Sequence, residues 1–463
     1  MFTQGTLGDA TIVNTTQVNL LSSDVAGSLN TTATTGGITD SGAVSVDGNG
    51  IFATLQSGAV IHLNQLNVTG SISLSTTGSA GDATIVNAVA IDLATSAVDG
   101  DLLVTATTGA ITDSGMTSTT GTAGFTTLQV NQAIALDQLA VDGSISLDTA
   151  AGGDATIVNK TAVDLASSTI GRNLSATATT GSITDSGTLN VANNGRFETL
   201  SADQTISLDE LNVATTIALF TQGIAGDATI VNTVLVDLAA TDVGGDLAVT
   251  AATGGIVDSG TVSVAGKTRF NSLESGTDIL LDQLDVTGTI SIMSVGPDGD
   301  VALVNTTDVD LASSDVDGAL SVTATTGTIT DSGTITVAKT ARFETLTADD
   351  TIAMDQLNVT GTIGVFTRGT TGDATIVNTT QVDFATSIVM GDLHVTAASG
   401  GIVDSGPVSV LDKMTVVSLQ MSGDILLDTL SVSRLDLTTN GPNADATIVN
   451  FRSLTICDAR VAG

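Results

Sequence analysis

The heptapeptide GDATIVN occupies residues 8–14 and returns at 81–87, 153–159, 226–232 and 372–378, with the variants GDVALVN at 299–305 and ADATIVN at 444–450. A second motif, ITDSG or IVDSG, keeps the same spacing at 38–42, 111–115, 183–187, 256–260, 329–333 and 402–406. Two motifs that advance together by 72 or 73 residues define a repeat whose units start near 8, 81, 153, 226, 299, 372 and 444. A period of this kind indicates a repeat architecture rather than a series of unrelated domains.

Each repeat contains a shorter beat, in which an apolar residue is followed two positions later by glycine. In the first repeat these pairs are Val25–Gly27, Val46–Gly48, Val68–Gly70 and Val98–Gly100, so the steps between glycines are 21, 22 and 30 residues. Segments of about 20–30 residues match single turns of a β-solenoid. We therefore predict three turns in each 73-residue repeat and about 18–19 turns in the chain.

Short stretches with alternating apolar and polar residues fill these turns. Examples are SISL (71–74), ATIV (83–86) and VAIDLA (89–94), which favour strands, and no stretch shows the period of a helix. Stacked turns about 4.8 Å apart would pair each strand with its neighbours and bury one face. The phase shared by Phe52, Phe125, Phe197, Phe270 and Phe343, with Val416 in the sixth place, predicts inward-facing aromatic side chains.

The predicted fold is all-β, a parallel β-helix that runs as one continuous solenoid over residues 1–463. The rival is a string of six β-sandwich domains of about 73 residues each. A sandwich would not repeat a glycine beat three times within one domain, and it would normally have a larger aromatic core. The first residues, MFTQGTL, resemble the internal stretch LFTQGIA (219–225), and the last residues also align with the inside of a repeat. We therefore expect a fragment cut within a repeat at both ends.

Composition limits the classes of partner. The formal net charge is −37, with 12 Lys and Arg against 49 Asp and Glu, which excludes the basic stripe that nucleic acids require. Aromatic residues make up 2%, without Trp or Tyr, which argues against an aromatic sugar-binding groove. The single cysteine, Cys457, forms no intrachain disulfide and is expected to be a small strand residue. No apolar stretch is long enough for a membrane-spanning helix.

The stretch VGGDLAVTAATGGIVDSGTVSVAG (243–266), followed by ILLDQLDVTGTISI (279–292), resembles the repeats of filamentous-haemagglutinin-like bacterial exoproteins. The resemblance covers essentially the whole chain and rests on structural motifs of the forms Gly-x-Leu-x-Val and Gly-x-Ile-x-x-Ser-Gly. It implies a right-handed parallel β-helix, secretion across the outer membrane and a role in adhesion. The resemblance lies in the repeats and does not extend to the amino-terminal secretion domain of that family, which we expect outside this fragment.

An Asp or Asn follows the middle strand of each predicted turn, which suggests one column of Asx residues in the order Asp, Asp, Asn. The first interpretation is that each side chain caps a turn by bonding its own backbone. The second is that neighbouring carboxylates about 5 Å apart bind Ca²⁺, which favours oxygen ligands. The calcium candidates are Asp113, Asp137, Asp185, Asp209, Asp258, Asp282, Asp331 and Asp355. Apart from this possible Ca²⁺, no cofactor is predicted.

The remaining polar candidates favour surface roles. His62 and His394 each stand between inward residues and should point outward, so they form no metal or catalytic pair. Arg196, Arg269 and Arg342 are expected to share one column, with Arg196–Glu198 and Arg342–Glu344 as local ion pairs of little energetic weight. An enzyme acting on polysaccharide is a minor alternative, because any catalytic group would be copied in six near-identical repeats.

The predicted function is the structural or adhesive shaft of a large secreted or cell-surface bacterial protein, outside the cell and without enzymatic activity. Such a shaft would hold a binding region toward a host-cell or matrix surface. The alternative is a filament subunit whose copies stack head to tail. Neither function requires nucleic acid or a membrane-spanning segment.

Overall fold

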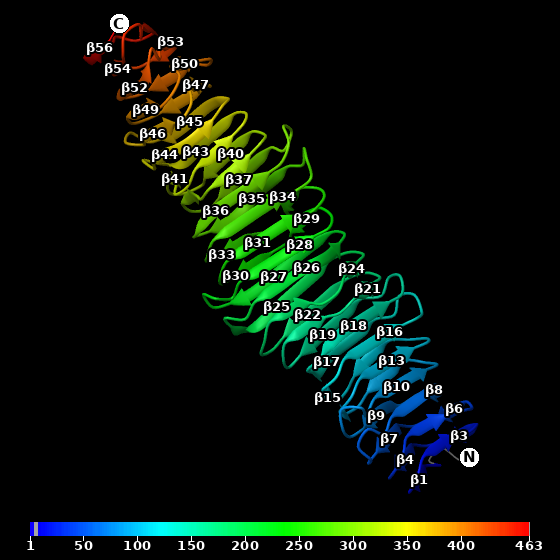
Figure 1. The fold of residues 1–463 in the computed structure, drawn as a ribbon. Helices are drawn as coiled ribbons and strands as arrows, with labels where there is room; N and C mark the ends of the chain where they lie inside the picture. Colours follow the sequence, from blue (N-terminus) through cyan, green and yellow to red (C-terminus); the bar gives the residue numbers. More distant parts are fainter. Residues whose placement is uncertain (4–7, 463) are drawn as a thin grey trace. The chain divides into compact units, whose positions relative to one another are not determined.

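The computed structural model describes residues 1–3 and 8–462, and every regular element in this part of the chain is a β-strand (Figure 1). The fold is an all-β parallel β-solenoid of about 21 turns. Residues 4–7 of the MFTQGTL stretch lie outside the described part. Contacts divide the chain into two compact units, Met1–Thr233 and Val234–Gly463. The single continuous solenoid over 1–463 stays a prediction.

In the first unit the strands form two parallel sheets, A and B, and each turn of the chain contributes to both. Sheet A contains β2 (Val18–Leu20), β3 (Ser23–Val25), β5 (Ile38–Asp40), β6 (Val44–Val46), β8 (Ile61–Val68), β10 (Ala83–Asn87), β13 (Leu102–Ala106), β16 (Ala123–Thr127), β18 (Ser144–Thr149), β20 (Val163–Leu165), β21 (Ser168–Ile170), β23 (Ile183–Asp185), β24 (Leu189–Val191), β26 (Ile206–Val213) and β28 (Ala228–Asn232). Sheet B contains β1 (Ala10–Asn14), β4 (Leu29–Ala33), β7 (Gly50–Thr54), β9 (Ser71–Ser75), β11 (Ile91–Leu93), β12 (Ser96–Val98), β14 (Ile111–Asp113), β15 (Thr117–Thr119), β17 (Ile134–Val141), β19 (Ala155–Asn159), β22 (Leu174–Ala178), β25 (Gly195–Ala202) and β27 (Thr216–Gln222).

The second unit has the same construction. Its strands of sheet A are β31 (Leu247–Ala251), β34 (Thr268–Ser272), β36 (Thr289–Ser294), β38 (Val309–Leu311), β39 (Ser314–Val316), β41 (Ile329–Asp331), β42 (Ile335–Val337), β44 (Ile352–Val359), β46 (Ala374–Asn378), β49 (Leu393–Ala397), β52 (Lys413–Met421), β54 (Arg434–Asn440) and β56 (Thr455–Arg460). Its strands of sheet B are β29 (Val236–Leu238), β30 (Thr241–Val243), β32 (Ile256–Asp258), β33 (Val262–Val264), β35 (Ile279–Val286), β37 (Val301–Asn305), β40 (Leu320–Ala324), β43 (Ala341–Ala348), β45 (Thr362–Arg368), β47 (Val382–Phe384), β48 (Ser387–Val389), β50 (Ile402–Asp404), β51 (Val408–Val410), β53 (Ile425–Ser431) and β55 (Ala446–Asn450).

The alternation of the sequence places one face of each strand in the core. In β10, Ile85 is fully buried and aligns with Leu63 of β8 on the preceding turn and with Val104 of β13 on the next. Its neighbours Thr84 and Val86 point away from the core and are half-buried. Equivalent apolar side chains therefore stack from turn to turn, and this ladder of aliphatic contacts is the core. Parallel pairing between successive turns rules out the string of β-sandwich domains.

The prediction of three turns per repeat is wrong. One repeat contains seven successive sheet segments that alternate between the sheets, β4, β5–β6, β7, β8, β9, β10 and β11–β12, which amount to three and a half turns. The glycine spacing predicts one turn between Gly70 and Gly100, but this 30-residue step holds three of these segments. A turn is therefore shorter than predicted, and the chain forms about 21 turns instead of 18–19.

The half turn moves equivalent residues to the other sheet from one repeat to the next. In the first unit the GDATIVN strand lies in sheet B as β1, in A as β10, in B as β19 and in A as β28. The aromatic positions follow the same rule, since Phe52 lies in β7 of sheet B and Phe125 in β16 of sheet A. The five predicted phenylalanines are fully buried, so their inward orientation is confirmed.

A tight turn follows each phenylalanine strand or its valine equivalent, and one residue in it adopts the left-handed backbone conformation. The residues at this place are Gly58, Asn131, Asp203, Gly276, Asp349 and Ser422, with φ from 61° to 79°. Glycine, asparagine and aspartate tolerate this conformation better than other residues. The position explains why the sequence of this turn varies only among small or short polar residues.

Candidate functional site

The predicted calcium candidates lie at a bulge that occurs once in each repeat. In β17 the register against the following strand β19 shifts between Leu136 and Leu139, which leaves Asp137 and Gln138 outside the regular ladder. The carboxylate of Asp113, one turn earlier, accepts both of their backbone N–H groups: Oδ1 from Asp137 at 3.0 Å and Oδ2 from Gln138 at 2.9 Å. The aspartate thus satisfies two donors that the bulge has removed from the sheet.

The other candidates are arranged in the same way. Asp185 accepts from the backbone of Asp209, Asp258 from that of Asp282, and Asp331 from that of Asp355, at 2.9–3.1 Å. In every pair the first carboxylate bonds mainly to the next turn. Its own backbone N–H, the partner that the capping interpretation predicted, makes a smaller contribution. The eight residues therefore form four pairs on neighbouring turns.

Burial raises the pKa of the first aspartate of each pair, Asp113, Asp185, Asp258 and Asp331, above the ordinary value of 3.8. The accepted backbone N–H groups oppose this rise because they stabilise the carboxylate, and the negative charge of the second aspartate adds to it. In the described part of the chain, no group of three or more His, Cys, Asp or Glu residues could hold a metal ion. Calcium binding by the pairs stays a prediction.

The asparagine of GDATIVN has a different role, which separates it from the aspartates. Asn159 is fully buried and bonds to the backbone of Val141 on the preceding turn: Oδ1 accepts the Val141 N–H at 2.9 Å, and Nδ2 donates to the Val141 carbonyl at 2.9 Å. The same two hydrogen bonds join Asn87 to Val68, Asn232 to Val213, Asn305 to Val286, Asn378 to Val359 and Asn450 to Val432. The predicted single Asx column is therefore wrong in register, because Asn14 aligns with Ala33 while Asp40 aligns with Leu20.

The first polar residue of GDATIVN bonds in the opposite direction along the stack. Asp82 Oδ1 accepts the backbone N–H of Asp101 on the next turn at 2.9 Å, and Asp373 accepts that of Asp392 at 2.7 Å. The heptapeptide thus contacts the following turn through its aspartate and the preceding turn through its asparagine. This double role explains the constancy of the motif, because both bonds require these side chains at a spacing of five residues.

The two histidines point outward, as predicted, on β8 and β49. The predicted ion pairs are confirmed, with Arg196 Nη1 at 2.7 Å from Glu198 Oε2 and Arg342 Nη2 at 2.6 Å from Glu344 Oε2. The common arginine column is wrong. In the second unit Arg269 lies in sheet A and Arg342 in sheet B, because successive repeats differ by a half turn.

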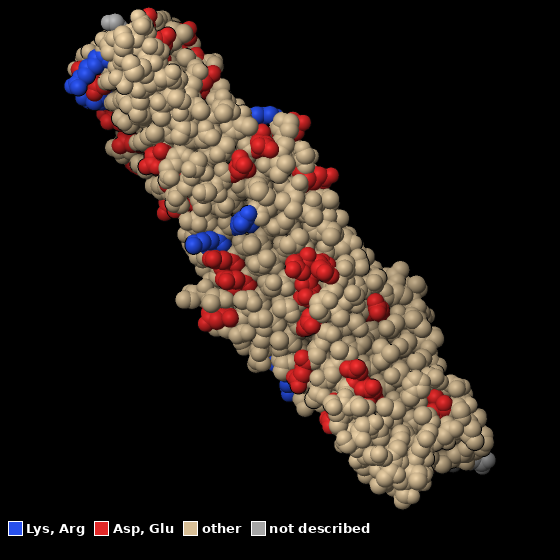
Figure 2. Space-filling view, in the orientation of Figure 1, with Lys and Arg blue, Asp and Glu red and all other residues tan. Residues whose placement is uncertain are grey.

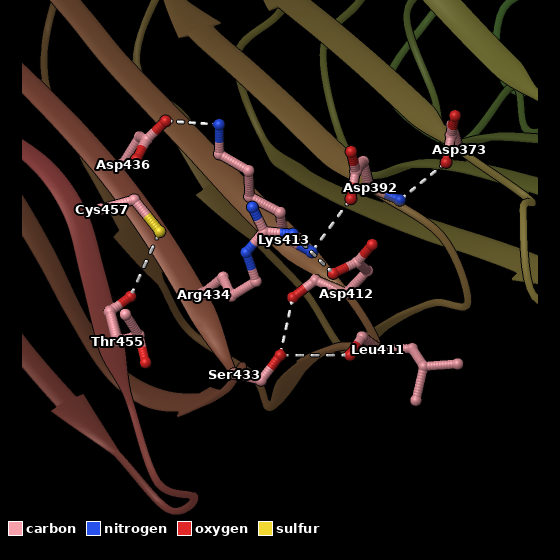
Figure 3. A network of polar contacts seen from close by, with 10 residues as sticks. All are labelled: Asp373, Asp392, Leu411, Asp412, Lys413, Ser433, Arg434, Asp436, Thr455 and Cys457. Carbon is pink, nitrogen blue, oxygen red and sulfur yellow. Dashed lines mark hydrogen bonds and ion pairs between the residues drawn. The ribbon is translucent and has the colours of Figure 1, made fainter.

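Cys457 is an exposed, free thiol on β56, within a polar network formed by the last turns of the second unit (Figure 3). Lys413 Nζ lies 2.5 Å from Asp436 Oδ2, and this bond raises the pKa of the lysine and lowers that of the aspartate. Arg434 bonds to Asp412 at 3.3 Å and also contacts the sulfur of Cys457, which raises the pKa of the arginine. The prediction of a small strand residue is confirmed, and no histidine belongs to this drawn network.

Charged side chains are spread thinly over the face drawn in Figure 2. Figure 2 shows scattered Asp and Glu side chains, a few Lys and Arg side chains, and large neutral areas on the face in view. In the described part of the chain, where the regular elements are strands, there is no helix long and apolar enough to cross a membrane.

The comparisons with known proteins agree with the repeat pattern. A family model described as "Repeats of unknown function (DUF5649)" matches residues 7–75, 80–151, 152–220, 225–293, 298–367 and 371–433. No curated protein and no solved structure shows significant similarity to the chain. Each of the six matched segments begins one residue before a repeat start derived from GDATIVN and its variant.

Proposed function

This chain belongs to the family of repeats of unknown function DUF5649, and on that premise we propose that it is the structural shaft of a large secreted or cell-surface bacterial protein. The observation that carries the proposal is the set of side-chain bonds between turns. The polar residues that recur most regularly, such as Asp113 and Asn159, form hydrogen bonds with the backbone of a neighbouring turn. Such bonds stabilise the stacking of one turn on the next.

The adhesive and extracellular parts of the proposal rest on the resemblance to filamentous-haemagglutinin-like exoproteins. A net negative charge of −37, with few basic residues, is compatible with a shaft that holds a binding region away from a cell. The partner would then be a host-cell or matrix surface. The proposal includes no enzymatic activity, because the aspartates with raised pKa values recur in four repeats and have a structural role in each.

Small-angle X-ray scattering from the full chain tests the shaft, because a shaft requires both units to share one axis. About 21 turns at about 4.8 Å each predict a maximum dimension of about 100 Å that does not change with protein concentration. A compact or strongly bent particle would contradict the shaft. Growth into longer particles at higher concentration would instead favour the filament subunit.

Surface labelling of intact cells that produce the protein tests the location. A membrane-impermeant lysine reagent should modify Lys160 and Lys339 in intact cells to the same extent as in lysed cells. Labelling only after lysis would contradict an extracellular shaft. Binding of beads coated with the chain to cultured cells or matrix proteins would assign adhesion to this segment itself.

A further inference from the structure

One surface groove of the second unit differs from its counterparts in the other repeats. It has a volume of about 470 Å³ and is lined by Glu344 of β43, Phe366 and Arg368 of β45, Ile388 of β48, and Met390, which directly follows β48. Phe366 and Ile388 are register partners on neighbouring turns. Ile388 is 44% exposed, so the groove presents apolar surface to solvent.

A charged cluster forms one wall of the groove. Glu344 accepts from two guanidinium groups, Arg342 at 2.6 Å and Arg368 at 3.2 Å, and Arg342 also lies 4.3 Å from the centre of the Phe366 ring. The Glu344 side chain is 17% exposed, whereas that of Arg368 is 57% exposed. The guanidinium of Arg368 has five N–H donors, and its described bond uses one of them. The nearby Asp349 directs Oδ1 to the backbone N–H groups of Thr370 and Thr371.

The repeats provide an internal comparison for this groove. Two repeats earlier, in the first unit, Arg196, Glu198 and Phe220 form the same cluster, with an ion pair of 2.7 Å and a ring distance of 4.4 Å. In the sequence, the places of Arg368, Ile388 and Met390 correspond two repeats earlier to Gln222 of the first unit and to Asp242 and Gly244 of the second. One repeat earlier the same places hold Val295, Asp315 and Asp317. The cation and both apolar side chains thus occur together in this groove and at neither of the two preceding places.

These replacements all make the groove less acidic and more apolar. Two places that hold acidic residues or glycine in the compared repeats become apolar, and a third gains a guanidinium, in a chain with only 12 Lys and Arg. Folding alone does not require the change, because the compared repeats adopt the same strands without it. A guanidinium beside an apolar surface complements a ligand that combines a carboxylate with a hydrocarbon group.

We propose that this groove binds an amphipathic carboxylate, such as a medium-chain fatty acid. The carboxylate is held by Arg368, and the hydrocarbon chain lies over Phe366, Ile388 and Met390. Glu344 orients Arg368 and holds Arg342 against the outer face of the phenylalanine ring. The volume falls in the range of about 300–1,000 Å³ typical of small-molecule sites.

The experiment titrates the full chain with decanoate and follows binding by isothermal calorimetry and by displacement of an anionic fluorescent probe, anilinonaphthalene sulfonate. The chain has no Trp or Tyr, so the probe signal carries little protein background. We expect one saturable site per chain. The variants R368Q, I388D and M390G each restore the residue of the compared repeat, so they should fold normally and bind at least about tenfold more weakly.

The control variant R196Q alters the equivalent cluster of the first unit and should leave decanoate binding unchanged. Decanol, which lacks the charge, should bind at least about tenfold more weakly than decanoate. The absence of saturable binding, equal binding of decanol, or unchanged binding by the combined R368Q, I388D and M390G variant would each overturn the proposal.

Discussion

The side-chain amide of Asn159 replaces a missing peptide partner for Val141. Its Oδ1 accepts the Val141 N–H and its Nδ2 donates to the Val141 carbonyl, both at 2.9 Å, next to the bulge where the regular ladder is interrupted. One turn before the bulge, the Asp113 carboxylate accepts the backbone N–H groups of Asp137 and Gln138. The irregular strand is therefore held from the turn before and from the turn after, and this accounts for the common spacing of the two sequence motifs.

We predict that N159A weakens the structure around the bulge. The substitution leaves the buried Val141 N–H without its partner, which costs about 1–3 kcal/mol. The Val141 carbonyl loses the bond from Asn159 Nδ2 but keeps the one from the Thr161 hydroxyl at 2.9 Å. Hydrogen exchange of the Val141 amide should become faster by at least about tenfold in the variant. The matched control is N14A, because Asn14 bonds to Thr16 and Gln17 of its own turn and is partly exposed, so little change is expected. Equal effects of the two substitutions would contradict this role.

The aspartate pairs predict that stability increases on mild acidification. Because the pKa of Asp113 is raised by folding, the folded chain binds this proton at a higher pH than the unfolded chain, whose pKa is near 3.8. The free energy of unfolding should rise as the pH falls from neutral through the raised pKa, and this gain should level off below about 3.8. The same direction holds for Asp185, Asp258 and Asp331.

Titration of the Asp113 carboxyl carbon by NMR measures this effect at a single site. The control variant is D137N, which removes the neighbouring charge and places asparagine where the first repeat already has Asn64. The pKa of Asp113 should fall in D137N but stay above that of an exposed aspartate, because burial is the larger cause. An unchanged pKa would show that the two carboxylates do not interact.

Calcium distinguishes the two interpretations of the aspartate pairs. Ca²⁺ takes six to eight oxygen ligands, whereas Asp113 already directs both oxygens to backbone N–H groups. We therefore expect Ca²⁺ and Mg²⁺ at equal ionic strength to raise the unfolding temperature equally, by screening alone. Calorimetric titration with Ca²⁺ could instead show a saturable heat of binding. If this heat disappears in the combined D137N, D209N, D282N and D355N variant, the pairs bind calcium.

Much of the fold could be predicted because the solenoid repeats its own pattern. Burial of Phe125 and Ile85 followed from their phase alone, since period-two alternation fixes the face of a strand. The half turn could not be predicted from the glycine beat, because the segment 71–100 contains three strand-forming stretches but only one glycine pair at its end. The different roles of Asp113 and Asn159 depend on how strands of successive turns align. The sequence pattern does not give this alignment, so the chemical similarity of Asp and Asn wrongly predicts one common column.

The groove at Arg368 gave no signal as a motif, because its residues come from strands more than 20 residues apart in sequence. Comparison of each repeat with the others could have found it. Arg368, Ile388 and Met390 depart from the residues at the same places in two earlier repeats, and the register brings them together. In a repeat chain, departures that converge in space are the useful indicator of a specialised site.

The central claim is that each repeat makes three and a half turns, and the segment 71–100 tests it most directly. In the structure Ser75 aligns with Ala97 on the next turn, whereas a register based on Gly70 and Gly100 would align Ser75 with Thr105. Spin labels at two cysteines, introduced in a C457S background, report which pair is adjacent. We predict strong dipolar broadening for labels at 75 and 97, because neighbouring strands lie about 5 Å apart, and none for labels at 75 and 105. Broadening for 75 and 105 without broadening for 75 and 97 would contradict the half turn and restore the three-turn repeat.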